Sequence, residues 1–284
     1  PTPRVSCSDV VARLRKTMSR LREAFDAVPL ATMSIMLLCI ALHGAAYLFG
    51  INVLDVAISP YFVVYRYQLY RVISAGLFHA SLMHIGFNMM SCYVLGASLE
   101  RFFGTLRLWY LSLLTLVLSN LLYVAISMLL YEITGALHWL ANPAVGYSGV
   151  LFGYALIESI MSPFPTRSVF GCFNVPTKLY PWVLLVLLSV LMPNISFLGH
   201  LCGILVGTCF AAGWLWWAMP SLDTFQRWDQ SRLLSWARAQ PSYVACPNSE
   251  LDGDARASAR NTFFVLYSAA RGLVVAVCQC AVGA

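Results

Sequence analysis

The stretch Gly146-Tyr147-Ser148-Gly149-Val150-Leu151-Phe152-Gly153 opens a strongly apolar segment of this chain. A second apolar segment opens at Gly199-His200-Leu201-Cys202-Gly203. A serine in a membrane helix usually bonds to its own backbone or allows close helix packing. An ionisable residue at such a position indicates function by default. Because a hydroxyl and an imidazole are the minimum set for nucleophilic catalysis, Ser148 and His200 are candidate catalytic residues.

Composition identifies a membrane protein. The 284 residues are 60% hydrophobic and 11% charged, whereas soluble domains carry about 25% charged residues. The net charge of +6 comes from basic residues beside apolar segments, which indicates membrane topology and no nucleic-acid partner. The nine cysteines have no metal-site spacing and are interpreted as packing residues and free thiols.

Hydropathy predicts an all-α polytopic bundle of six transmembrane helices. A crossing needs roughly twenty apolar residues, or fewer where the helix starts below the surface. The expected spans are about 30–50, 80–99, 106–131, 147–161, 180–191 and 196–217. Residues 51–74 mix aromatic and polar side chains and predict an interfacial first loop.

The flanking segments predict the orientation. Residues 1–28 form a basic segment expected at the cytosolic face, and residues 29–217 the helical domain. Residues 218–284 are expected to be a cytosolic tail with an unknown partner; the apolar stretch 262–283 is a possible extra segment, which Arg271 interrupts. With a cytosolic N-terminus, sixteen of the 18 Lys and Arg residues lie on the cytosolic side, as the positive-inside rule requires.

This topology predicts that Ser148 and His200 lie at the same depth, because helices four and six both begin at the non-cytosolic face. Gly149 and Gly153 on helix four, and Gly199, Gly203 and Gly207 on helix six, form small-residue faces that permit close approach. No acidic residue in the membrane is placed to orient His200. A Ser–His dyad is therefore favoured over a triad.

A second polar cluster is expected on helix two. His84 and Asn88 are four residues apart and share a face, and His79 precedes them. They could supply hydrogen bonds to a developing oxyanion, or simply hydrogen-bond neighbouring helices. A metal site is a rival interpretation, but no carboxylate or cysteine joins these histidines at ligand spacing.

Taken together, these motifs resemble the rhomboid intramembrane serine protease family over about residues 66–217. The resemblance rests on His79-x4-His84-x3-Asn88, Leu95-Gly96-x3-Glu100 followed by Gly104, Gly146-Tyr147-Ser148-Gly149, and Gly199-His200-x2-Gly203-x3-Gly207. It implies that Ser148 is the nucleophile and His200 the general base. It also implies that His84, Asn88 and the Ser148 backbone N–H stabilise the oxyanion, and that His79 holds the first loop.

The resemblance implies an endopeptidase that cleaves transmembrane or juxtamembrane segments of membrane proteins without a cofactor or metal. The lipid bilayer and transmembrane substrates are the expected partners. The alternative is a non-catalytic rhomboid-like protein that binds membrane helices in quality control. Six helices and a cytosolic tail are most similar to the eukaryotic endoplasmic-reticulum branch of the family.

Overall fold

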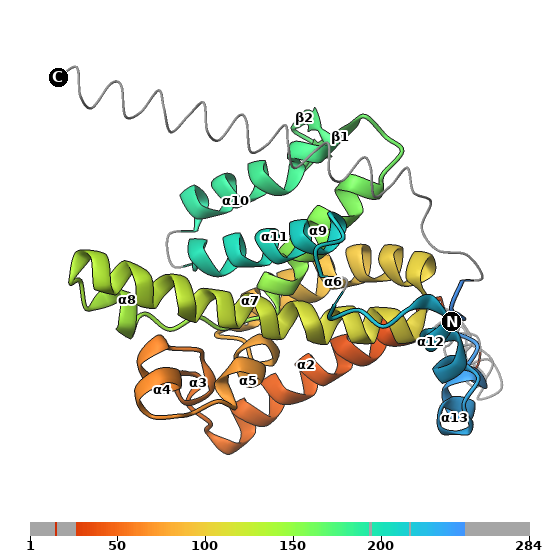
Figure 1. Cartoon of the computed structure of the whole chain (residues 1–284), viewed down its shortest axis with the longest axis horizontal. Helices are drawn as coiled ribbons and strands as arrows, with labels where there is room; N and C mark the ends of the chain where they lie inside the picture. Colours follow the sequence, from red (N-terminus) through yellow and green to blue (C-terminus); the bar gives the residue numbers. More distant parts are fainter. Residues whose placement is uncertain (1–14, 16–26, 193–194, 216, 248–284) are drawn as a thin grey trace, which may run out of the picture.

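The computed structural model describes residue 15 and residues 27–192, 195–215 and 217–247. Almost all of the basic segment 1–28, and the whole apolar stretch 262–283, lie outside the described residues. The described chain is a helical bundle whose longest members run side by side in Figure 1. This confirms the predicted helical membrane fold.

Six apolar helices form the bundle: α2 (Leu30–Phe49), α6 (Leu82–Phe103), α7 (Thr105–Thr134), α9 (Ser148–Met161), α10 (Tyr180–Leu191) and α11 (Phe197–Ala211). By length and composition, α2, α6 and α7 are long enough to cross a membrane. The other three are shorter, and α9 lies centrally, packed against α6, α7, α10 and α11. Most of α9 is buried, which explains its nearly continuous apolar sequence.

The predicted interfacial loop consists of three short helices, α3 (Val53–Val56), α4 (Pro60–Tyr65) and α5 (Arg71–Leu77). The buried Arg71 guanidinium ties α5 to α3 by donating to the carbonyls of Leu54 and Ala57, at 2.7 and 2.6 Å, and it lies 4.5 Å from the centroid of the Phe62 ring of α4. A further short helix, α8 (His138–Ala141), follows α7.

Two elements differ from the sequence expectation. Residues 166–176, which lie between the expected spans 147–161 and 180–191, form a hairpin of β1 (Thr166–Val169) and β2 (Phe173–Pro176), followed by a 3-10 turn, η1 (Thr177–Leu179). The sixth helix was expected to reach residue 217 but ends at Ala211. The physical reason is Gly213, whose φ of +75° is a left-handed conformation that terminates helices.

The first part of the tail packs against the bundle. It contains α12 (Leu222–Asp229), η2 (Arg232–Leu234) and α13 (Ser235–Arg238). Beyond them, the Leu30 N–H donates to the Ser242 carbonyl (2.9 Å), and the Thr105 N–H to the Val244 carbonyl (2.8 Å). Residues 242–244 are therefore attached to the starts of α2 and α7.

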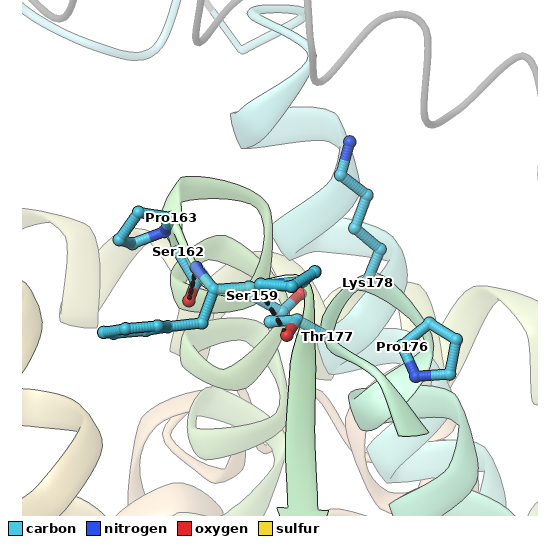
Figure 2. Close-up of a pocket in the computed structure, with 8 residues that line it drawn as sticks. Ser159, Ser162, Pro163, Pro176, Thr177 and Lys178 are labelled. Atoms are coloured by element: carbon cyan, nitrogen blue, oxygen red, sulfur yellow. Dashed lines mark hydrogen bonds between the residues drawn. The ribbon is translucent and has the colours of Figure 1, made fainter. Parts of the chain in front are cut away.

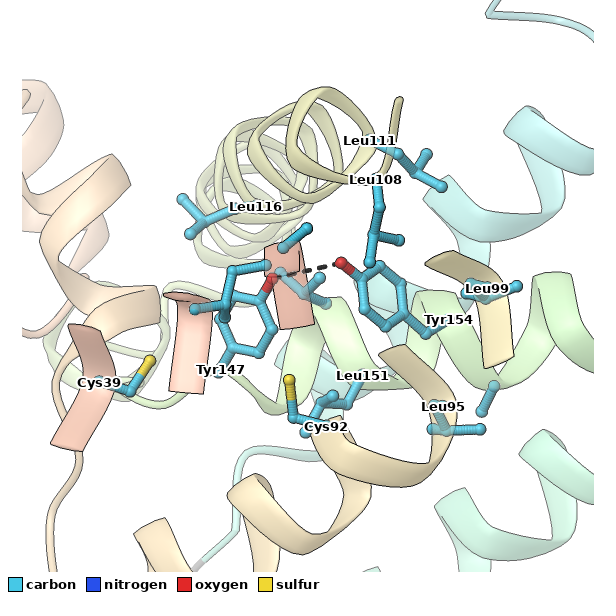
Figure 3. Close-up of a cluster of buried hydrophobic side chains, with 14 of the residues drawn as sticks. Cys39, Cys92, Leu95, Leu99, Leu108, Leu111, Leu116, Tyr147, Leu151 and Tyr154 are labelled. Atoms are coloured by element: carbon cyan, nitrogen blue, oxygen red, sulfur yellow. Dashed lines mark hydrogen bonds between the residues drawn. The ribbon is translucent and has the colours of Figure 1, made fainter. Parts of the chain in front are cut away.

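The main hydrophobic cluster joins α2, α6, α7 and α9 and encloses two tyrosines (Figure 3). The Tyr147 and Tyr154 hydroxyls lie 3.4 Å apart, and Tyr154 also hydrogen-bonds Ser112. Each buried hydroxyl thus has a partner inside an otherwise apolar core, as a buried polar group requires.

Candidate active site

Ser148 is the first residue of α9, and His200 lies in the first turn of α11. The Ser148 Oγ lies 2.8 Å from the His200 Nε2, within hydrogen-bond distance. His200 is buried and Ser148 is partly exposed. The fold therefore brings together the two residues that the sequence nominated, with the serine on the more accessible side.

The closeness of α9 and α11 depends on glycines. A Cβ atom built on Gly203 would lie 1.9 Å from the Gly149 carbonyl oxygen, and one on Gly207 would lie 2.7 Å from the Gly153 oxygen. Such distances mean that the two backbones are in direct contact. This contact lets the short serine side chain reach the imidazole.

Two of the five glycines on these faces, Gly149 and Gly199, are less constrained. A Cβ on Gly149 would lie 3.5 Å from the Gly199 oxygen, which is an ordinary contact. A Cβ on Gly199 would face Ser196, whose hydroxyl caps the start of α11 by accepting the Gly199 N–H. A Cβ on Gly153 would lie 3.1 Å from the Gly203 oxygen and 2.9 Å from Thr115 Cγ2. The close approach therefore depends on Gly153, Gly203 and Gly207 more than on Gly149 and Gly199.

The imidazole of His200 is held by stacking. Its ring lies 4.3 Å from the Phe152 ring, centroid to centroid, with 25° between the planes. Within the described part of the chain, the buried Nδ1 of His200 has no hydrogen-bond partner. Sequence reasoning missed Phe152, although its position four residues after Ser148 on the same helix face is a signal for it.

Asn88 and His84 lie on α6 at the same end of the bundle. The buried Asn88 donates through Nδ2 to the His84 carbonyl (2.9 Å), while its Oδ1 has no partner among the described residues. The His84 ring lies against Gly146, where a Cβ would be 2.6 Å from His84 Cε1. Gly146 also has a φ of +119°, so both space and conformation require glycine there.

His79 contacts the turn that leads into the nucleophile. The Tyr147 N–H points to His79 Nε2 (3.4 Å), and the Gly146 N–H donates to the Ala75 carbonyl (2.7 Å). The His79 and His84 rings meet edge to face at 5.2 Å. In the described ranges, no three His, Cys, Asp or Glu side chains are arranged to hold a metal ion. The His79 ring contacts the backbone of the turn before Ser148.

Comparison with known proteins identifies the family. Residues 66–217, more than half of the chain, match the rhomboid domain. The chain belongs to the rhomboid family. This confirms the resemblance seen in the sequence motifs, and with the apolar helices it makes this rhomboid an integral, multi-pass membrane protein.

Several curated relatives are similar to this rhomboid. Rhomboid-like protein 15 of Arabidopsis thaliana is 36% identical over 234 residues, which cover 80% of this chain and 57% of that protein. Human Rhomboid-related protein 4 is 34% identical over 143 residues, or 50% of this chain and 45% of its own. Rhomboid-type serine protease 2 of Saccharomyces cerevisiae is 28% identical over 177 residues, covering 62% and 64%. The matches span about half to two thirds of these relatives' lengths.

Proposed function

We propose that this rhomboid is a serine-type intramembrane endopeptidase with Ser148 as nucleophile and His200 as general base. The observation that carries the proposal is the 2.8 Å separation of Ser148 Oγ and His200 Nε2. A nucleophile and base within this reach are the geometric signature of covalent acyl transfer. That relatives are named serine proteases agrees with this assignment.

The reaction begins when His200 Nε2 accepts the Ser148 proton and the serine oxygen attacks the scissile carbonyl carbon. The tetrahedral intermediate places negative charge on the carbonyl oxygen. The Ser148 backbone N–H, at the positive end of the α9 dipole, is one donor to that oxygen. His200 then protonates the leaving amine, and a water molecule activated by the same nitrogen hydrolyses the ester.

Asn88 and His84 are proposed as further donors to the oxyanion. The Asn88 amide is bonded to the His84 carbonyl, so rotation of its side chain on substrate binding would redirect an N–H. Catalytic hydrogen bonds commonly form only in the substrate complex. His79 and Gly146 support the proposed oxyanion site by fixing the turn before Ser148.

Phe152 takes part of the role that a carboxylate has in a triad. In a triad the third group fixes the imidazole orientation and stabilises the imidazolium. Here the stacked phenylalanine fixes the ring plane but supplies no charge. The proposed enzyme is therefore a dyad protease, and its substrates are transmembrane or juxtamembrane segments that unwind near the Ser148 end.

The distribution of basic residues supports a cytosolic N-terminus, which directs Ser148 toward the opposite face. We propose the endoplasmic reticulum as the site of action, by resemblance to the six-helix eukaryotic branch. The tail after residue 218 is proposed to be cytosolic.

The decisive experiment is labelling of the purified protein by a fluorophosphonate probe in detergent, alongside cleavage of a model transmembrane substrate. Ser148→Ala and His200→Ala should each lower cleavage by about 10⁴-fold or more, and removing both should add little because the pair acts as a unit. Ser189→Ala is the matched control, since its hydroxyl is bonded to the Leu185 carbonyl within α10.

Loss of labelling in Ser148→Ala but not in Ser189→Ala supports the proposal. If Ser148→Ala keeps substantial protease activity, the assignment is wrong. If the wild type binds transmembrane segments without labelling or cleavage, the chain is instead a non-catalytic membrane-helix-binding rhomboid.

A further inference from the structure

The hairpin of β1 and β2 is firmly attached to the two helices that it connects. Arg167 of β1 forms an ion pair with Glu158 of α9, and its guanidinium lies 4.5 Å from the centroid of the Tyr180 ring at the start of α10. Thr177 Oγ1 donates to the Phe164 carbonyl (2.7 Å) and closes the base of the hairpin. The hairpin therefore has a defined position relative to the membrane helices.

The helices that the hairpin joins indicate its side of the bundle. The chain runs from Ser148 along α9 to the hairpin and then returns along α10. The hairpin therefore lies at the end of α9 that is remote from Ser148. In Figure 1 it projects sideways near α10 and is set back, along the direction of the long helices, from α12.

The outer surface of the hairpin and its entry carries three exposed phenylalanines. Phe164, Phe170 and Phe173 are 70, 64 and 48% exposed, whereas Val169 on the inner side is fully buried. Phe170 has a φ of 49°, a left-handed conformation that a bulky residue rarely adopts. The chain thus presents a phenylalanine at a turn position where glycine or asparagine would be easier.

The backbone of the hairpin argues against a position in the hydrocarbon interior of the bilayer. Among the described residues the sheet has two strands, so the outer edge of each has N–H and C=O groups that no described strand pairs with. Such edges need water or lipid headgroups, because lipid tails cannot hydrogen-bond them. Aromatic side chains, by contrast, favour the boundary between headgroups and acyl chains.

A hollow at the base of the hairpin is also consistent with a position in the headgroup layer. Its volume is about 290 Å³, and it is lined by the hydroxyl-bearing Ser159, Ser162 and Thr177, by Phe164 and prolines, and by Lys178 (Figure 2). Mixed apolar and polar walls with a cationic rim match the headgroup layer better than either water or hydrocarbon.

We propose that the hairpin is a phospholipid-contacting element, seated in the interfacial layer of the leaflet opposite Ser148 with its phenylalanines at the acyl boundary. The occupant of this surface is lipid, because the hairpin joins two apolar helices of the bundle and α10 itself has a lipid-accessible apolar face, on which Val186 and Val190 are 60 and 74% exposed. This placement is independent of whether Ser148 is catalytic.

The test is nitroxide accessibility in phospholipid bilayers. The full chain is reconstituted with single labels at the natural, exposed Cys172 and at Phe170→Cys, after replacing the other reactive cysteines. Val186→Cys is the lipid-facing reference, and the exposed Ala239→Cys is the aqueous reference. Collision with oxygen, which partitions into lipid, is compared with collision with a water-soluble nickel chelate.

At Phe170→Cys, the ratio of oxygen to nickel collisions should exceed that at Ala239→Cys by severalfold and lie below that at Val186→Cys. A ratio equal to that of Ala239→Cys would place the hairpin in water and overturn the proposal. Protection from both reagents would mean that protein covers the surface, which also overturns it. Size-exclusion profiles of each variant confirm folding without reference to activity.

Discussion

Helix α6 carries a buried polar cluster at each end, and the two clusters differ in how completely they are hydrogen-bonded. At its C-terminal end the fully buried Glu100 carboxylate accepts four hydrogen bonds of 2.6–2.7 Å. The donors are the Ala31 N–H, the N–H and hydroxyl of Thr32, and the Thr105 hydroxyl. This cluster ties α2, α6 and α7 together.

At the N-terminal end of α6 the polar atoms are only partly bonded. Within the described residues, Asn88 Oδ1, His79 Nδ1 and His200 Nδ1 are buried without partners. Buried polar groups without partners are costly, and a role in binding or catalysis is one explanation for them. We propose from this comparison that the Glu100 end stabilises the fold, while the Ser148 end keeps bonding capacity for a substrate.

The Glu100 end is also the attachment point of the tail. The Thr105 hydroxyl that donates to Glu100 also accepts the Val244 N–H at 2.9 Å. The tail residues 242–246 thus complete the same cluster, because the chain near Ala245 also lies against Gly104. The tail, at least up to residue 247, is part of the folded bundle.

The largest effect on the Ser148 end is expected from Gly203→Leu, with Gly203→Ala close behind. A Cβ 1.9 Å from the Gly149 oxygen forces α9 and α11 apart and should destabilise the packing by about 3 kcal/mol or more. Fluorophosphonate labelling of Ser148 should disappear. Gly149→Ala, with ordinary contacts, and Leu205→Phe, off the glycine face, should keep most labelling. Equal losses in all of these variants would contradict the proposed helix contact.

At the other end, Glu100→Ala should reduce stability with a smaller effect on chemistry. Four donors lose a charged acceptor, so the free energy of unfolding should fall by about 3–5 kcal/mol. Thermal unfolding in detergent measures it, with the exposed Glu132→Gln as control. Below the new unfolding midpoint, labelling of Ser148 should persist. Loss of labelling in a still-folded Glu100→Ala protein would show that the two ends are not separate in function.

Asn88→Ala should act on turnover. Loss of one oxyanion donor typically lowers turnover by about 10²–10³-fold, with less effect on substrate binding. The matched control is Asn120→Ala, because Asn120 donates to the Val72 carbonyl on a structural contact between α7 and α5. Steady-state cleavage, separated into kcat and KM, distinguishes the two. Equal changes in kcat and binding for Asn88→Ala would indicate a structural role.

The smallest effect is expected from a change in the apolar cluster, away from both the Glu100 end and the Ser148 end. Tyr154→Phe removes a hydroxyl that bonds Ser112 and Tyr147 in the apolar cluster, which should lower the free energy of unfolding by about 1 kcal/mol. Tyr93→Phe, at an exposed position on α6, is the control and should change nothing measurable. A large loss of labelling in Tyr154→Phe would mean that the tyrosine pair positions Ser148.

The sequence by itself determined the helical membrane fold and nominated Ser148, His200, His84 and Asn88. Hydropathy and the placement of basic residues reflect how each segment interacts with the bilayer. They can therefore be interpreted for each segment without knowing which other segments it contacts. Small-residue spacing on two helices also predicted that these helices could approach closely. What spacing could not give is which glycine is essential, because that depends on the rotation of one helix against another.

The tertiary structure alone decided the contacts between residues far apart in the chain. The stacking of Phe152 on His200 and the attachment of Val244 to Thr105 are of this kind. So is the hairpin after α9, whose base Arg167 and Thr177 fix to neighbouring elements. Such contacts leave no periodic pattern in the sequence, since each depends on where the rest of the chain brings its partner.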